Sequence, residues 1–407
     1  MEDRRNTGSV TKRLYDDDAY IKEFRAGVIG CSPAGDKAFG IELDMTAFFL
    51  EGGGQKSDTG RIGDAVITDV QEKDGHILHI SDRPLDTGAE YDCAIDFAKR
   101  YDRMQNHSAE HLLCGIIHNM TGYDNVGFHL SDDETILDIN GPVSKEMLKE
   151  AEEKANKVIY ENVPITAAFL SGDELKGIDY RSKLDITENV RIVTIEGYDK
   201  CACCAPHVRS TGEIGIIRII NAMPHRGGVR ITILAGERAY RDYVYLDESN
   251  RQYMAWLSTK RLEGAKGVEQ IINKNRTLSE DNVRLKKELT SIVLDDLKKK
   301  LENKNDYRPV PVFSANFDDV MMRNLINEGL KMTDAAIMGF TGDDENGYKY
   351  IIGAKEDKGI LYKGEYTDLP GFAKIMNGAL NGRGGGSRLM IQGSLKALRN
   401  DIEEFFV

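Results

Sequence analysis

The chain has 407 residues, enough for about two to four domains, and a net charge of −13. This acidic balance excludes nucleic-acid binding by bulk charge alone, so any such binding must use local basic patches. It has no apolar stretch of about 20 residues to span a membrane and no apolar secretory signal near its start, so we expect a cytoplasmic protein without membrane association.

The first 245 residues predict two domains of different composition. Residues 1–95 alternate short β-like runs with Gly and Asp turns, which predicts a small N-terminal β-barrel. Residues 96–245 mix helical and strand patterns and predict a central α/β domain. In this domain we expect helices at 97–120 and 145–162 and strands at 135–139, 164–170 and 191–195.

Residues 250–303 are charged and helical, with an apolar residue at every seventh position. The apolar series is Ile271, Leu278, Leu285 and Ile292, and the companion positions are Val268, Asn275, Asn282 and Leu289, with two polar interruptions. The repeat favours a coiled coil that pairs two chains into a homodimer, with the two Asn able to set register and partner number. The alternative is a long solvated connecting helix with one apolar stripe.

A proline-marked linker, Asn303 to Pro311, precedes the last predicted domain. Residues 306–407 contain strand patterns at VPVFSA, AAIMGF, YKYIIGA and RLMIQG, and predict a compact α/β unit. The four stretches together indicate an α+β protein.

Two spaced pairs of side chains predict a metal site. His107 and His111 are four residues apart in a helical pattern, so both imidazoles project from one helix face. Cys203 and His207 have the same spacing on a loop between two β-rich stretches. Three imidazoles and one thiolate suit tetrahedral zinc. The alternative is core histidines and a buried cysteine. The six cysteines do not resemble a disulfide framework.

Glycine marks two further segments. The sequence EGGGQKSDTG, from Glu51 to Gly60, follows a strand-like run and predicts either a close backbone approach to a ligand or a hairpin turn. The sequence NGRGGGSR, from Asn381 to Arg388, predicts a glycine-rich turn between arginines. It lies in an acid-free stretch, and backbone N–H groups beside guanidinium groups bind phosphate well. We expect RNA phosphate contacts from Lys374, Arg383, Gly384, Gly385, Gly386 and Arg388.

Four of these segments resemble, in chain order, the editing module of alanyl-tRNA synthetases. They are EGGGQKSDTG, RYDRMQNHSAEHLL, GFHLSDDETILDI and CACCAPHVRSTGEIGIIRI. The chain is most similar to the free-standing alanyl-tRNA editing proteins of the long AlaX type, and NGRGGGSRLMIQG resembles the C-terminal domain that follows the module.

The resemblance implies a deacylase that removes serine, and in some members glycine, from mischarged tRNA(Ala) by ester hydrolysis. It implies zinc ligands at His107, His111, Cys203 and His207. It also places Gly52, Gly53, Gly54 and Gln55 beside the substrate. The acid-free basic stretch separately predicts a role in tRNA binding for residues 306–407.

The chain departs from the family pattern at two places. The loop reads Cys-Cys-Ala-Pro-His where synthetases usually have Cys-Gly-Gly-Thr-His, so Cys201 and Cys204 become rival thiolates. Glu110 stands where many synthetases have a threonine that contacts the substrate, and Ser108 is a second candidate for a polar substrate contact.

Two other functions fit parts of the sequence. HSAEH satisfies the H-x-x-E-H pattern of zinc metallopeptidases, in which Glu110 would activate water. A non-catalytic RNA-binding protein with a structural zinc is the other alternative, because catalytic zinc usually keeps an open position. A phosphodiesterase is disfavoured because the chain has no Asp-His-His triplet.

Overall fold

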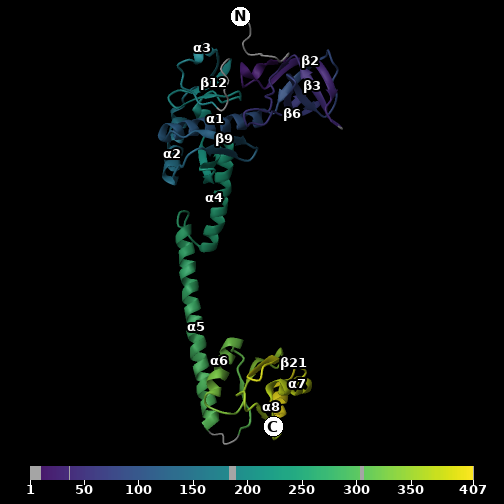
Figure 1. Cartoon of the computed structure of the whole chain (residues 1–407), viewed down its shortest axis with the longest axis vertical. Helices are drawn as coiled ribbons and strands as arrows, with labels where there is room; N and C mark the ends of the chain where they lie inside the picture. Colours follow the sequence, from purple (N-terminus) through teal and green to yellow (C-terminus); the bar gives the residue numbers. More distant parts are fainter. Residues whose placement is uncertain (1–10, 36, 183–188, 303–306, 407) are drawn as a thin grey trace. The chain divides into compact units, whose positions relative to one another are not determined.

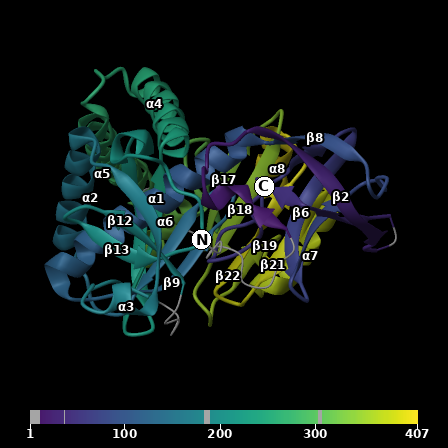
Figure 2. The same cartoon turned by 90° about the horizontal axis from the view of Figure 1, so that it is seen from above.

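A computed structural model describes residues 11–35, 37–182, 189–302 and 307–406. The chain forms two compact units, Met1–Gln252 and Tyr253–Val407, whose elements are labelled in Figures 1 and 2. Residues 1–10 of the N-terminal segment and residues 303–306 of the predicted linker lie outside the described residues. Helices and several separate sheets alternate along the chain, which confirms the α+β class. Among the described residues, none of the helices combines the length and apolar character needed to cross a membrane.

The first unit begins with a closed six-stranded barrel, in the order β2-β3-β7-β6-β5-β8. Along β7 every second side chain is buried, as expected for a strand with one face on a core. Ile41, Ile62, Ile67 and Ile77 fill the barrel. The barrel strands are β2 (Glu23–Pro33), β3 (Phe39–Leu43), β5 (Gly60–Ile62), β6 (Ala65–Lys73), β7 (His76–Ser81) and β8 (Glu90–Ile95).

A buried helix, α1 (Phe97–Thr121), follows the barrel directly. Asp96 caps its first turn by accepting a hydrogen bond from the Lys99 amide, and Gly122 ends it with a φ of 74°. Within the helix, a Cβ on Gly115 would lie 2.5 Å from the Tyr198 carbonyl oxygen. Glycine at this position therefore lets the turn before β13 (Asp199–Ala202) lie against α1.

Two sheets and a second helix, α2 (Lys145–Glu161), surround α1 and share its core. One sheet has the order β14-β15-β10-β9 and the other β11-β12-β13. The loop after β13 carries Cys203 and His207, so this packing brings the loop toward α1. The strands are β9 (Asn125–Leu130), β10 (Thr135–Ile139), β11 (Ile165–Leu170), β12 (Val190–Ile195), β14 (Ile217–His225) and β15 (Gly228–Ala235), and α4 (Glu237–Leu257) follows.

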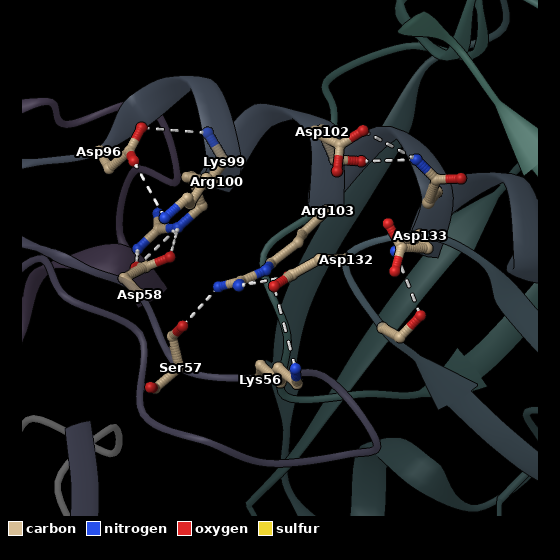
Figure 3. Close-up of polar contacts among 12 residues, drawn as sticks. Lys56, Ser57, Asp58, Asp96, Lys99, Arg100, Asp102, Arg103, Asp132 and Asp133 are labelled. Atoms are coloured by element: carbon tan, nitrogen blue, oxygen red, sulfur yellow. Dashed lines mark hydrogen bonds and ion pairs between the residues drawn. The ribbon is translucent and has the colours of Figure 1, made fainter. Parts of the chain in front are cut away.

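Ionic contacts fix α1 against the barrel and the glycine-rich segment (Figure 3). The fully buried Arg100 donates from Nε to both carboxylate oxygens of Asp58, at 3.1 and 2.9 Å. One turn later, Arg103 donates to the Ser57 carbonyl and, at 2.9 Å, to Asp132. Because Ser57 and Asp58 follow the glycines at 52–54, these bonds hold that segment at a fixed place along α1.

The second unit contains α5 (Gly264–Glu302), α6 (Asp319–Leu330) and a five-stranded sheet of order β16-β17-β18-β22-β21. Leu297 near the end of α5 is buried with Met322 and Leu325 of α6. The four strand patterns predicted here correspond to β16 (Val310–Phe313), β17 (Ile337–Asp343), β18 (Gly347–Gly353) and β22 (Met390–Leu395). The remaining elements are β19 (Ile360–Tyr362), β20 (Glu365–Thr367), α7 (Leu369–Ala379), β21 (Gly382–Gly386) and α8 (Arg399–Phe405).

Candidate metal and substrate site

The two spaced pairs meet in space. Helix α1 presents His107 and His111, and the loop after β13 presents Cys203 and His207. One ligand atom from each of the four lies within 4.8 Å of the others. The Cys203 Sγ atom is 3.6 Å from Nε2 of His107 and 3.4 Å from Nε2 of His207. The cluster could therefore hold a metal ion.

Each of the three imidazoles has a hydrogen-bond partner on its Nδ1 atom. His107 donates to Gln55 Oε1 at 2.8 Å, and His111 donates to Asp199 Oδ2 at 3.0 Å. The Nδ1 atom of His207 lies 3.0 Å from Ser108 Oγ. Such outer partners fix the ring orientation, and the Gln55 and Asp199 oxygens also fix the tautomer, so that the Nε2 lone pairs of His107 and His111 are free for an ion. Three oriented nitrogens and a thiol fit the donor set of a zinc-type site.

The thiols near the site differ in acidity. Burial alone would raise the pKa of Cys203, but the neighbouring His107 and hydrogen bonds with the three imidazoles hold this pKa well below its usual range. Burial raises the pKa of Cys201, and raises that of Cys204 to about 11. Burial also lowers the pKa of His207 to about 3, which keeps its ring neutral. Of the three thiols, Cys203 is thus the one with the lowered pKa, although Cys201 forms a second close group with His111 and Asp199.

The glycine-rich segment forms a tight hairpin turn. The Gly52 amide donates to the Gln55 carbonyl at 3.1 Å, and the Gln55 amide donates back to Gly52 at 3.0 Å. Gly53 and Gly54 have φ values of 60° and 82°, where a side chain would be strained. A Cβ on Gly54 would also lie 2.8 Å from the Phe128 carbonyl oxygen. The turn therefore lets Gln55 enter the interior beside His107.

A cavity of about 330 Å³ opens beside the metal-ligand cluster. Of the residues predicted to contact substrate, Gly53 and Glu110 line it. Gly52, Gly54 and Gln55 belong to the hairpin turn, and Ser108 is fully buried against His207. The described lining residues are Gly53, His107, Glu110, His111, Phe128, Phe169, Arg181, Ser182, Asn189, Val190, Arg191, Cys201, Ala202, Cys203 and Cys204.

Three charged residues of the site carry no local sequence signal. Asp199 accepts two hydrogen bonds from Arg181, at 2.7 and 3.0 Å. Burial would raise the pKa of Asp199, but His111 and Arg181 together lower it, so the carboxylate stays charged beside the imidazole. Arg191 donates from one nitrogen to the carbonyl oxygens of Cys203 and Ala205, both at 2.9 Å. These contacts depend on strand packing and could not be read from spacing.

The second glycine-rich segment, Asn381 to Arg388, differs from its predicted conformation. Gly382–Gly386 is strand β21 at the edge of the sheet, and not a turn. The glycines are needed for packing, because a Cβ on Gly384 would lie 2.3 Å from the Gln392 carbonyl oxygen. Of Gly384, Gly385 and Gly386, which were predicted to bind tRNA, only Gly385 has open space where a Cβ would lie. The side chains of Lys374, Arg383 and Arg388 are exposed.

The chain is similar to several known proteins that act on or edit alanyl-tRNA by name. Residues 190–232, which span the Cys203–His207 loop, match the family described as "Threonyl and Alanyl tRNA synthetase second additional domain". The alanyl-tRNA editing protein Aarsd1-A of Xenopus laevis is 25% identical over 402 residues, covering 95% of this chain and 94% of that protein. The alanine–tRNA ligase of Ignicoccus hospitalis is 34% identical over 295 residues, 68% of this chain.

This chain spans only 32% of the Ignicoccus ligase, but nearly the whole Xenopus editing protein. Among solved structures, the C-Ala domain of Aquifex aeolicus alanyl-tRNA synthetase is 18% identical with a TM-score of 0.21, covering 26% of this chain and 95% of that domain. This score carries no conclusion about the fold. The resemblance of the chain to alanyl-tRNA editing proteins, expected from its motifs, is confirmed.

Proposed function

We propose that this protein is a trans-editing aminoacyl-tRNA deacylase that hydrolyses Ser-tRNA(Ala), with Gly-tRNA(Ala) as a second substrate. The observation that carries the proposal is the cluster of His107, His111, Cys203 and His207, which opens on a cavity beside the hairpin turn. The similarity over nearly the whole length to proteins named for alanyl-tRNA editing supports the same activity.

The metal we propose for the site is zinc, held by these four side chains. When bound, zinc would supply positive charge that polarises an ester carbonyl or lowers the pKa of water. The protein's own residues would position the substrate. An aminoacyl ester is already activated, so the cavity needs chiefly to hold its carbonyl in one orientation for attack by water.

Selectivity would come from a polar contact in the cavity. Serine differs from alanine by one hydroxyl group, and a cavity that hydrogen-bonds this hydroxyl is left with an unpaired polar group when alanine enters. Ser182 and Asn189 are uncharged polar side chains on the cavity wall. We propose this part of the wall, together with Gly53 of the hairpin turn, as the surface that distinguishes serine.

The second unit would bind the tRNA. Exposed Lys374, Arg383 and Arg388 lie on α7, on β21 and just after β21, in a stretch of the chain without acidic residues. We also propose that the helix within residues 250–303 pairs two chains. Ile271, Leu278, Leu285 and Ile292 of α5 are between 54% and 68% exposed, and their seven-residue spacing suits a coiled-coil seam.

The test is a deacylation assay with purified full-length protein and tRNA(Ala) charged with serine, glycine or alanine. We expect rapid release of serine and slow release of alanine. Equal rates for serine and alanine would refute the selectivity. The alternative is an RNA-binding protein with a structural metal, and it is favoured by the closed set of four protein ligands. Tight tRNA binding without release of any amino acid would establish that alternative.

A further inference from the structure

Glu110 occupies a defined place on the cavity wall. It lies beside His111 on α1, is 4% exposed and lines the cavity. Its Oε2 atom is 3.7 Å from His111 Nε2. Its Oε1 atom accepts a hydrogen bond from the Asn125 side-chain amide. Asn125 is itself oriented, because its Oδ1 atom accepts from the Gly127 amide at 3.0 Å. The carboxylate is therefore fixed with one oxygen directed toward the metal-ligand cluster.

The chemistry of the wall sets Glu110 apart. Among the described residues that line the cavity, Glu110 has the single carboxylate, and the other polar groups are imidazoles, thiols, guanidinium groups, a hydroxyl and an amide. An aminoacyl ester carries an ammonium group on the carbon next to its carbonyl. A carboxylate shielded from water binds such a cation more strongly than it binds a neutral hydroxyl, since a charged donor strengthens the hydrogen bond and weak screening preserves the attraction.

We propose that the Glu110 carboxylate binds the α-ammonium group of the aminoacyl ester. The inference rests on the proposed function and names the substrate group that this wall recognises. Serine, glycine and alanine share the ammonium group, so Glu110 would not choose among them. It would instead orient the aminoacyl group so that the ester carbonyl faces the cluster of His107, His111, Cys203 and His207, and would disfavour acyl groups that lack the cation.

The test measures binding to the zinc-loaded full-length protein by calorimetry, with two non-hydrolysable ligands. One is 3'-deoxyadenosine carrying a seryl amide at the 3' position, and the other has an α-hydroxyl in place of the ammonium group. Measurements at about pH 6.5 keep the amine charged, since α-amino groups titrate near pH 7.7. Glu110→Gln keeps the size and the acceptor for Asn125. Glu150→Gln removes the same charge from an exposed site on α2.

We expect wild type and Glu150→Gln to bind the ammonium ligand about tenfold or more tightly than the hydroxyl ligand, the range of a hydrogen bond between charged groups. In Glu110→Gln the two affinities should fall within about twofold, with the zinc content unchanged. A preference retained in Glu110→Gln would overturn the proposal, as would equal affinities in wild type. Zinc loss from Glu110→Gln would assign the carboxylate to the metal and also overturn it.

Failure of the proposed function gives a different result. Selective binding of the ammonium ligand by a protein that releases no serine from Ser-tRNA(Ala) would leave the Glu110 assignment standing and refute the deacylase. Release of serine at equal rates by wild type and Glu110→Gln, with the ligand preference intact in both, would support the deacylase and refute the Glu110 assignment.

Discussion

The Asp199 carboxylate joins His111 to Arg181. Its Oδ2 atom accepts from His111 Nδ1 at 3.0 Å, while Arg181 donates to both of its oxygens. The guanidinium group holds the carboxylate in one orientation, and the carboxylate holds the imidazole with Nε2 turned away from it. Asp199 thus links a strand of the three-stranded sheet to the metal-ligand cluster on α1.

We expect Asp199→Asn to weaken zinc binding by about 10- to 100-fold, the usual effect of losing an outer partner of a ligating histidine. An amide can donate to Nδ1 as well as accept from it, so the tautomer of His111 would no longer be fixed. Competition with a zinc chelator gives the affinity. Asp173→Asn, at an exposed helix position, is the control and should leave it unchanged. An unaltered affinity in Asp199→Asn would show that Arg181 and α1 suffice to place the ring.

The three neighbouring cysteines should differ in their effect on metal content. Cys203→Ala removes the side chain whose pKa is lowered by the surrounding imidazoles, and we expect it to abolish tight zinc binding. Cys201→Ala and Cys204→Ala remove thiols whose pKa values are raised, and these variants should keep about one zinc per chain. Elemental analysis of the purified variants measures this. A full zinc content in Cys203→Ala would show that Cys201 or Cys204 supplies the thiolate ligand instead.

The sequence predicted the parts of the site that depend on local spacing. His107 and His111 share a helix face because α-helical periodicity places residues four apart together, and the Cys203–His207 loop has the same span. Asp199 and Arg181 were not predicted, because their contact with His111 exists only after β13 packs on α1. Ser108 was predicted as a substrate contact, and the structure places its hydroxyl beside His207.

The glycine segments show a different difficulty. Glycine permits turns, positive φ and close approach of strands, so the residue type alone does not choose among them. At Gly53 and Gly54 the structure uses positive φ in a hairpin turn. At Gly384 it uses the missing side chain, because the backbone of β22 leaves no room for a Cβ. The choice at each place is made by neighbouring strands that are distant in sequence.

The barrel should lose stability as the pH falls below about 6.5. His79 is fully buried, and burial lowers its pKa from 6.5 to about 4. Its Nδ1 atom donates to the Ile41 carbonyl at 2.9 Å, and Nε2 lies 2.8 Å from the Thr46 hydroxyl, an arrangement that suits the neutral ring. Between about pH 4 and pH 6.5, His79 is therefore protonated in the unfolded chain and neutral in the folded chain. The stabilisation is complete above pH 6.5 and is lost as the pH falls toward 4.

The expected loss from His79 is about 3 kcal/mol between these two pH values, at about 1.4 kcal/mol per pKa unit. Urea unfolding of wild type and His79→Gln at several pH values measures it. Glutamine does not titrate, so the variant should show a shallower decline in this range even if it is less stable throughout. Parallel curves for the two proteins would mean that another group governs the acid transition.

Arg383 and Arg388 should carry much of the tRNA affinity if the second unit grips phosphates. An acidic protein must concentrate its phosphate contacts, and these two exposed side chains lie at and beyond the edge strand β21. Replacing both by Ala should weaken tRNA binding and reduce the slope of log affinity against log salt by about one to two, roughly one for each lost contact. Binding of fluorescent tRNA(Ala) at several salt concentrations gives both quantities.

The control is the paired change Arg276→Ala and Arg284→Ala on α5. It removes the same charge where each arginine already pairs with acidic neighbours, and should alter the slope little. If the two double variants bind alike, net charge rather than this edge of the sheet sets the affinity.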